Sequence, residues 1–346
     1  MPALRSIATK LSLLVGSLVV ALLLAELYFR TVRPIKFLEI GEQASSDPGA
    51  WMNLIHRPSS VPGLAYELAP NLDREAREAR VRTNSLGMRD EEPLARDTPG
   101  LLRVLALGDS VTYGYRVEAP QSYCSVLEQS FAEVPPPDGR RVEVLNTGVS
   151  GYSTRDEALA LNGKWLALEP DVLLVGYCLN DPESDPRQPL PRFFTPPHWW
   201  QHSALARYLV QREQGRGVRE LGGGRYFRYL HAPSTSAWRS VERGFDSIGG
   251  AARARGAPVV VVIFPLFSPA PWAEYEYREP HARVAEAAAR HGFLVLDLLA
   301  RFEREDPQSL ILDAGDSHPN ARGHQIAAEA IREFLLSHWG VISGRR

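Results

Sequence analysis

Residues 103–114 read RVLALGDSVTYG, a short apolar run that leads into small and polar residues. The run RVLAL is continuous instead of alternating, which is typical of a strand buried on both faces of a parallel sheet. Four similar runs follow: VEVL (142–145), DVLLVGY (171–177), PVVVVIF (258–264) and FLVLDL (293–298). Between the runs lie segments with the length and pattern of helices, at 121–133, 154–168, 236–255, 279–291 and 321–336. These repeated βα units predict an α/β fold with a doubly wound, five-stranded parallel sheet.

Length and composition narrow the class of protein. The chain has 346 residues, which predicts two domains or one large domain with additions. Its 39 Lys and Arg residues are balanced by 41 Asp and Glu residues, so no basic surplus is available to bind a nucleic acid. Cys124 and Cys178 are the only cysteines, too few for a disulfide scaffold or a four-cysteine zinc site. Whether these two cysteines pair stays open at this point.

The apolar residues are concentrated near the N-terminus. Residues 11–29 read LSLLVGSLVVALLLAELYF, with Glu26 as the only charge. A helix of this length reaches about 28 Å, close to the hydrocarbon thickness of a bilayer, and this one is apolar on every face. We therefore expect a retained single-span anchor. A cleaved signal peptide is the main alternative, although the segment lacks the short apolar core and the small-residue cleavage site of a signal peptide. A buried core helix is a weaker alternative.

The orientation of this span is not set by its flanking charges, because basic residues stand on both sides of it. A short tail before the span and a large domain after it favour an extracytoplasmic domain. We expect a tail over 1–10, the anchor over 11–30, a linker over 31–100 that packs on the domain, and the domain itself over 101–340. The segment 182–235 is rich in Pro, Arg and aromatic residues, and we interpret it as a lid-like insertion; a structural excursion that packs on the linker is the alternative.

Polar and small residues follow three of the predicted strands, where active sites of such sheets lie. Ser110 stands between the first strand and a helix, so it is a candidate nucleophile whose own N–H can bind an oxyanion, although Asp-Ser is also an ordinary turn. Gly148 and Gly151 follow the second strand and are candidate oxyanion donors; a plain βα turn with Thr154 as helix cap is the alternative. Asn180 follows the third strand, and its side-chain amide is a further candidate donor.

A fourth polar stretch, DSHPNARGH (316–324), follows the fifth strand and precedes the last helix. His318 is expected in the loop before that helix, from where its imidazole can reach across the edge of the sheet. Asp316 is near enough to hydrogen-bond one ring nitrogen, which leaves the other nitrogen free to take a proton from Ser110. Asn320 is expected to cap the helix, and His324 to pack within it. The joint occurrence of a serine, oxyanion donors and a late Asp/His pair predicts nucleophilic catalysis.

With these four blocks in this order, the sequence resembles the SGNH, or GDSL-type, hydrolases from about residue 103 to about residue 336. The resemblance implies a three-layer α/β/α, flavodoxin-like fold. It also implies ester hydrolysis through an acyl-enzyme on Ser110, with His318 as base and Asp316 as its orienting partner, and with no metal or cofactor. Gly151 and Asn180 match the oxyanion donors of the family, beside the N–H of Ser110. The stretch NSLGMR (84–89) and the end of the apolar helix, AELYFR (25–30), resemble a membrane-anchored bacterial branch.

Two positions depart from the pattern of the family. Cys178 stands where its third block has a glycine, which narrows the pocket. Asp316 precedes His318 by two residues instead of three, a spacing that resembles some polysaccharide O-acetylation enzymes of the same superfamily. Asp313 is therefore a reserve candidate for the role of Asp316.

The sequence thus predicts a serine esterase or deacylase that acts on a carbohydrate- or lipid-linked acyl group. Two alternatives stay open: acyl transfer to an extracytoplasmic glycan by the same residues, and a membrane-anchored binding protein that has kept the fold without catalysis. A nucleotide cofactor is not expected, because no G-x-G-x-x-G motif follows the first strand. The oligomeric state does not follow from the sequence.

Overall fold

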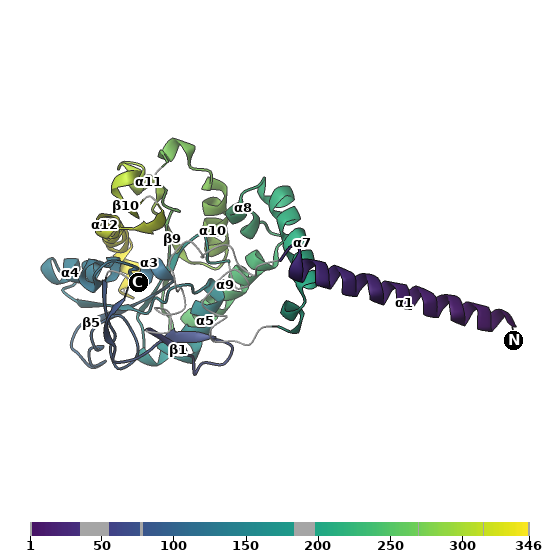
Figure 1. Cartoon of the computed structure of the whole chain (residues 1–346). Coiled ribbons are helices and arrows are strands. Elements are labelled where there is room, and N and C mark those ends of the chain that lie inside the picture. The colour runs from purple at the N-terminus through teal and green to yellow at the C-terminus, as the bar shows by residue number, and fades with distance from the viewer. Residues whose placement is uncertain are drawn as a thin grey trace.

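The computed structural model describes residues 2–34, 55–76, 79–182, 198–268, 270–313 and 315–344. Its central sheet has five parallel strands: β5 (Leu101–Gly108), β6 (Arg141–Asn146), β7 (Val172–Tyr177), β8 (Val259–Ile263) and β9 (Leu294–Asp297). They lie in the order β6-β5-β7-β8-β9 (Figure 1). Numbered along the sheet-forming part of the chain this is 2-1-3-4-5, the strand order of flavodoxin-like folds. The predicted α/β fold with a five-stranded parallel sheet is confirmed.

Helices cover both faces of this sheet. One face packs against α5 (Thr154–Gly163), α9 (Ser236–Arg255) and α10 (Arg278–Arg290), and the other against α4 (Tyr123–Glu133) and α12 (Ala321–Ser337). Side chains of β5 alternate between the two cores: Leu105 and Leu107 enter the first, Val104 and Ala106 the second. Both faces of the strand are therefore buried, which is why its sequence is apolar without interruption.

Local hydrogen bonds set the ends of these helices. At the start of α5, the Ser153 side chain accepts from the N–H of Asp156 while the Asp156 carboxylate accepts from the N–H of Ser153. Asn320 accepts from two N–H groups of the first turn of α12, so its predicted role as N-cap is confirmed. The helix predicted over 154–168 is divided at Lys164, after which a 3-10 turn, Trp165–Leu168, continues to the next strand.

Part of the predicted linker shares the core of the domain. It forms two antiparallel pairs, β1 (His56–Pro58) with β2 (Tyr66–Leu68) and β3 (Asp73–Ala76) with β4 (Ala79–Arg82). Tyr66 is buried, and its hydroxyl donates to the carbonyl of Ser150 at 2.9 Å. The backbone carbonyl of Tyr66 accepts from the hydroxyl of Tyr152 at 2.6 Å. These bonds hold the loop that follows β6. Residues 35–54 of the predicted linker lie outside the described residues, and the boundaries 1–10, 11–30, 31–100 and 101–340 stay predictions.

The described part of the insertion contains two α-helices that the sequence patterns did not predict, α7 (Ala204–Gly222) and α8 (Tyr226–Leu230). Just after α8, His231 is buried and its Nε2 lies 2.9 Å from the hydroxyl of Tyr177 at the end of β7. The described part of the insertion packs on α10 and, through α7, on the N-terminal helix. Residues 183–197 lie outside the described residues, and the lid over 182–235 stays a prediction.

The N-terminal helix α1 (Pro2–Thr31) projects away from the domain (Figure 1). Its segment Thr9–Thr31 is long and apolar enough to cross a membrane, and none of its most apolar window is buried in the protein. Such a helix is compatible with a membrane anchor or with a signal peptide. Because it is exposed almost throughout, a role as a core helix of the domain does not fit.

Candidate active site

Ser110 lies at the carboxyl end of strand β5, on the first turn of the short helix α3 (Ser110–Tyr113). Asp109 caps this turn, because its carboxylate accepts a hydrogen bond from the N–H of Val111 at 2.9 Å. The abrupt change from buried strand to helix places the Ser110 hydroxyl at the open edge of the sheet, as the sequence predicted. The N–H of Ser110 has no acceptor among the described residues.

His318 and Asp316 complete a hydrogen-bonded chain with Ser110. His318 Nε2 lies 2.7 Å from the Ser110 Oγ, and His318 Nδ1 lies 2.5 Å from the Asp316 Oδ1. The two residues belong to β11 (Asp316–Pro319), which pairs antiparallel with β10 (Ile311–Asp313). The predicted loop position of His318 is thus wrong: a two-stranded hairpin carries it, and pairing with β10 fixes the backbone on which the imidazole stands.

The charge of Asp316 determines which ring nitrogen carries the proton. Burial opposes ionisation of this carboxyl group, but the hydrogen bonds from His318 and Arg116 outweigh burial and lower its pKa to about 2. An ionised carboxylate only accepts hydrogen bonds, so Nδ1 of His318 carries the hydrogen. In the neutral imidazole Nε2 is then the acceptor, and the hydroxyl of Ser110 donates to it. The ring of Tyr115 covers the imidazole, with ring centres 4.5 Å apart.

Arg116 is a residue of the site that the sequence analysis missed. Its Nη1 donates to the Asp316 Oδ2 at 3.0 Å and to the Asp313 Oδ2 at 2.8 Å. Asp313, the reserve candidate, therefore contacts Arg116, whereas Asp316 contacts His318. Arg116 has a φ of 58°, a left-handed conformation that is rare for residues other than glycine. Arg116 lies three residues after the end of α3. The left-handed backbone is the feature that distinguishes it, and backbone angles cannot be read from the sequence.

The two other candidate oxyanion donors lie on the loops after β6 and β7. Gly151 has a φ of 81°, which favours glycine, and its N–H has no acceptor among the described residues. The side-chain amide of Asn180 donates to the Asp109 Oδ2 at 2.8 Å. One of its two N–H bonds is engaged in this way, which fixes the amide plane and leaves the second N–H for another acceptor. Asp109 thus orients both the serine helix and Asn180, a role that the sequence analysis did not assign.

Close packing joins the loop after β6 to the serine helix. A Cβ on Gly148 would lie 2.4 Å from the backbone nitrogen of Tyr113, so only glycine fits there. The side-chain amide of Asn146 adds a hydrogen bond to the carbonyl of Thr112 at 2.8 Å, and its oxygen accepts from the N–H of Gly148 at 3.0 Å. These contacts fix the distance between the loop that carries Gly151 and the helix that carries Ser110.

Buried acids and a thiol lie beneath Ser110. Ligand atoms of Asp109, Cys178 and Asp181 are within 4.8 Å of one another, a spacing that a metal ion could bridge. Burial, however, raises the pKa of the Cys178 thiol well above its usual value, and burial raises that of Asp181 as well. Glu157, buried beside them, has two carboxyl oxygens without a partner in the described structure, and burial raises its pKa too. A raised pKa favours the protonated form of Cys178, Asp181 and Glu157, and metal ligands must give up that proton.

Cys178 and Cys124 are both buried, free thiols. Cys178 replaces the glycine of the family pattern, and its side chain packs into the core between the sheet and α4. The open question of a disulfide between the two cysteines is therefore answered: the structure contains none between them.

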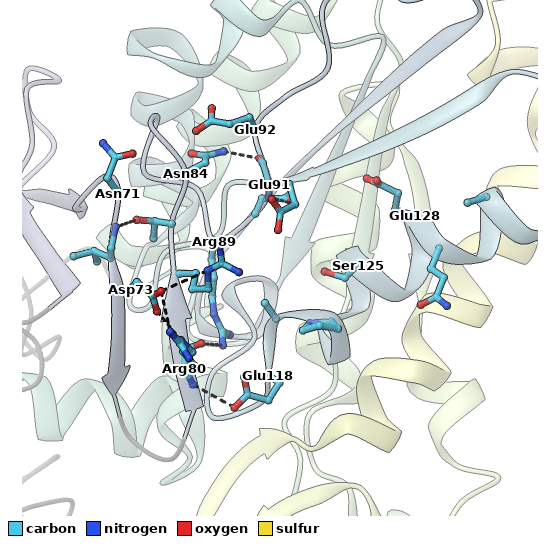
Figure 2. A pocket seen from close by; sticks show the side chains of 18 residues that line it. Asn71, Asp73, Arg80, Asn84, Arg89, Glu91, Glu92, Glu118, Ser125 and Glu128 are labelled. Carbon is cyan, nitrogen blue, oxygen red and sulfur yellow. Dashed lines mark hydrogen bonds and ion pairs between the residues drawn. The ribbon is translucent and has the colours of Figure 1, made fainter.

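A cavity of about 720 Å³ lies apart from these residues, between the β3–β4 hairpin and α4 (Figure 2). Arg80 and Asp73 of the hairpin form an ion pair on one side of it, and Glu128 of α4 faces it from the other. Arg89 crosses its floor and donates to the carbonyls of Gly114 and Val117, just after the serine helix. The lining of the cavity includes none of Ser110, Asp316 and His318.

The model of the GDSL-like lipase/acylhydrolase family matches residues 106–326, almost two thirds of the chain. The chain belongs to this family. As a GDSL-like hydrolase it acts on ester bonds, which confirms the enzyme class predicted from the sequence. No curated protein matches the chain.

Several solved structures are similar to this GDSL-like hydrolase. TesA is 18% identical, with a TM-score of 0.43, and the match covers 68% of this chain and 98% of TesA. A lipase/acylhydrolase from Enterococcus faecalis is 17% identical, with a TM-score of 0.43 and coverage of 68% and 96%. The acetyl xylan esterase AlAXEase is 16% identical, with a TM-score of 0.44 and coverage of 68% and 100%.

Proposed function

We propose that the protein is a serine esterase or deacylase in which Ser110 is the nucleophile, His318 the general base and acid, and Asp316 the residue that orients and stabilises the imidazole. The observation that carries this proposal is the continuous chain of hydrogen bonds from the Ser110 Oγ through both ring nitrogens of His318 to the Asp316 carboxylate. Nucleophile, base and orienting group within hydrogen-bond reach are the geometric signature of an activated serine.

The first half of the reaction forms the acyl-enzyme. The Ser110 Oγ attacks the ester carbonyl carbon, and its proton passes to Nε2 of His318. The resulting imidazolium lies beside the ionised Asp316, which stabilises the positive charge. His318 then returns the proton to the departing alkoxide oxygen, the C–O bond of the ester breaks, and the alcohol leaves.

The second half releases the acid. Water attacks the acyl carbon while His318 accepts one of its protons, and the bond to the Ser110 Oγ then breaks as the proton returns to the serine. In both halves a negative charge develops on the carbonyl oxygen. The N–H groups of Ser110 and Gly151 and the free N–H of the Asn180 amide are the proposed donors to that oxygen.

The proposed substrate is a carbohydrate- or lipid-linked acyl ester, bound without a metal or cofactor. The proposed catalytic domain spans residues 101–340, and residues 11–30 form a single-span anchor that holds it on the extracytoplasmic side of a membrane. The exposed apolar surface along α1 supports an anchor, because a water-exposed helix of this composition is unfavourable outside a bilayer.

The test compares the full-length protein in detergent with its Ser110→Ala variant on a short-chain p-nitrophenyl ester. We expect the rate to fall by at least about 10³-fold, because the nucleophile and its proton transfer are both lost. Ser130→Ala is the matched control, since among the described residues the Ser130 hydroxyl donates to the carbonyl of Leu127 on its own helix, α4, and to no residue of the site. Unchanged turnover in the Ser110 variant would contradict the mechanism.

Two further readouts separate the alternatives. A fluorophosphonate probe should label Ser110 of the folded wild-type protein and leave the Ser110→Ala variant unlabelled; a folded wild-type protein that is not labelled would indicate a binding protein without catalysis. Mass spectrometry of an oligosaccharide incubated with the enzyme and an acyl donor distinguishes ester hydrolysis from acyl transfer.

A free carboxylic acid as the main product supports the proposed hydrolysis, and an acylated oligosaccharide as the main product contradicts it.

A further inference from the structure

Glu26, the only charge in the apolar stretch 11–29, serves as a cap for a helix of the catalytic domain. Its carboxylate accepts from the N–H groups of Ala204 and Leu205, both at 2.9 Å, and from the hydroxyl of Ser203 at 2.8 Å. These N–H groups belong to the first turn of α7, where backbone donors have no partner within the helix. A carboxylate at this end also interacts favourably with the helix dipole. The only charge of the apolar stretch is therefore used to hold α7.

Two neighbouring residues of α1 strengthen the contact. Arg30 donates to the Glu26 carboxylate at 2.6 Å and to the carbonyl of His202 at 2.7 Å, so it bridges the two segments. Phe29 stacks on Tyr208 of α7 with ring centres 4.2 Å apart. The AELYFR segment (25–30) and residues 202–208 thus form one docking contact, which we call the clasp.

The clasp fixes the depth of α7 relative to a membrane. Glu26 lies five residues before the end of the apolar segment Thr9–Thr31, about 7 Å along the helix axis. That segment is about 34 Å long, slightly more than the hydrocarbon core, so the clasp lies where α1 leaves the apolar layer. Figure 1 shows α7 crossing the end of α1, between α1 and the body of the domain. When α1 spans a bilayer, α7 is consequently the element of the domain nearest to the lipid.

Exposed apolar and aromatic side chains are concentrated on α7 and on the residues just before it. Outside the N-terminal helix and its end, the large hydrophobic side chains exposed among the described residues are Val134, Trp199, Leu209, Val210, Leu221 and Val341. Four of these six lie between 199 and 221, and Trp199 is 85% exposed. Exposed tryptophan is typical of membrane–water interfaces. Helix α7 also carries four arginines against two glutamates, a balance that favours anionic headgroups.

We propose that the segment 199–210 is a membrane-surface contact: the clasp holds it at the headgroup level of the bilayer, where Trp199 and Leu209 enter the interface. The proposal rests on the single-span anchor proposed above. In this proposal the insertion holds the catalytic domain on the membrane in one orientation. The active site then acts on esters that are carried by the bilayer or lie close to it.

The experiment measures how close single positions lie to lipid. Full-length protein is placed in nanodiscs that contain phosphatidylcholine and phosphatidylglycerol, and bimane is attached to one introduced cysteine at a time; native Cys124 and Cys178 are buried. The test positions are Trp199→Cys and Leu209→Cys. Val134→Cys and Val341→Cys are matched controls, because both side chains are exposed and hydrophobic but belong to other parts of the domain. Leu14→Cys reports on the anchor itself.

Quenching by lipids brominated near the headgroup or along the acyl chain gives distinct outcomes. Loss of fluorescence at 199 and 209 with headgroup-proximal bromine, and none at 134 and 341, supports the proposal. Quenching of Leu14→Cys by lipids brominated along the acyl chain, without quenching at 199 and 209, overturns the surface contact and leaves the anchor intact. Absence of quenching at position 14 overturns the anchor, and the surface contact with it.

A second variant tests the clasp. Glu26→Ala removes the carboxylate that binds the first turn of α7 and leaves the N-cap Ser203 in place, whereas Leu24→Ala changes an exposed neighbour that has no part in the clasp. We expect the loss of quenching at 199 and 209 in the first variant only. We also expect the first variant to hydrolyse a vesicle-borne ester more slowly while its rate on a soluble p-nitrophenyl ester stays unchanged. Full quenching in Glu26→Ala would overturn the role of the clasp.

Discussion

At the scale of single residues, Arg116 compensates for an unusual spacing. Asp316 and His318 are neighbours on one short strand, so the carboxylate needs a second contact to stay beside Nδ1 of the ring. Arg116 supplies it, because its guanidinium holds the Asp316 Oδ2 while the Oδ1 faces His318. Its hydrogen bond, together with the hydrogen bond and charge of His318, also lowers the pKa of Asp316 to about 2, against the effect of burial. Asp316 therefore stays ionised throughout the pH range in which an esterase is assayed.

Replacement of Arg116 by Gln should slow the proposed reaction. The variant loses a charged hydrogen bond to Asp316, of a kind worth about 1.5–3 kcal/mol, so we expect kcat to fall about tenfold or more with little change in KM. The fall in kcat without a matching change in KM is the signature of a positioning residue. Steady-state kinetics on a p-nitrophenyl ester measures it.

Asp313→Asn is the matched control for this variant. The variant removes the other carboxylate partner of Arg116 and leaves the contact between Arg116 and Asp316 in place. The Asp313 side chain is half exposed. We expect nearly wild-type kinetics. A rate loss in Asp313→Asn equal to that in Arg116→Gln would mean that the ion-pair cluster as a whole, and not the contact with Asp316, supports the rate.

At the scale of elements, the sequence predicts the sheet well because its strands are buried on both faces. All five strands and the five helices between and after them follow from continuous apolar runs and helix-length spacing, and the observed ends differ by at most a few residues. The 3-10 turn after α5 is an exception, because an apolar pattern does not register a break in backbone geometry at Lys164.

Elements stabilised by distant contacts were harder to predict. The strands β10 and β11 have three and four residues, too few for a periodic signal, and they pair only with each other. The first turn of α7 donates two backbone hydrogen bonds to Glu26, almost 180 residues away in the chain. The same limit applied to the candidate site. Ser110, Asp316 and His318 stand in recognisable sequence blocks, whereas Arg116 contributes through a hydrogen bond to Asp316, 200 residues away, that no local sequence pattern indicates.

The packing of the loop after β6 on α3 gives a prediction at this scale. Gly148→Ala places a Cβ 2.4 Å from the backbone nitrogen of Tyr113, so the loop and the serine helix must separate. We expect a loss of about 1–3 kcal/mol of stability, as in other overpacked cores, and a lower kcat. Urea unfolding and ester hydrolysis measure the two effects.

Gly250→Ala is the matched control for the packing prediction. Gly250 lies within α9, and a Cβ there would meet no atom within 4 Å. Alanine should leave activity unchanged and stabilise the helix by up to about 1 kcal/mol. A Gly148→Ala protein as stable and active as this control would show that the loop and α3 can shift without cost.

At the scale of the whole molecule, burial opposes the ionisation of several acids. Burial raises the pKa values of Asp156, Glu157, Asp181 and Glu128. Burial likewise raises the pKa of Asp90 to about 7, with a contribution from the charge of Glu128 and against a hydrogen bond from the N–H of Asn146. Asp90 and Glu128 both line the cavity between the hairpin and α4, and Figure 2 shows Glu128 on the α4 side of it. The fold is therefore expected to gain stability as the pH falls from neutral, within the range where these groups titrate.

Asp90 allows this expectation to be tested with one substitution. In the unfolded chain its carboxyl group ionises near pH 3.8, and in the folded protein near pH 7, so between these values the folded state holds a proton that the unfolded state has lost. Its contribution to the free energy of unfolding is complete below pH 3.8 and falls as the pH rises to 7, by up to about 4 kcal/mol. Asp90→Asn is neutral at every pH and should lack this part of the slope. Urea unfolding between pH 4 and pH 8 measures this dependence of the free energy of unfolding on pH, with the exposed Asp97→Asn as control. An equal pH dependence in wild type and Asp90→Asn would mean that Asp90 is ionised in the folded protein, stabilised by a cation or by water in the adjoining cavity.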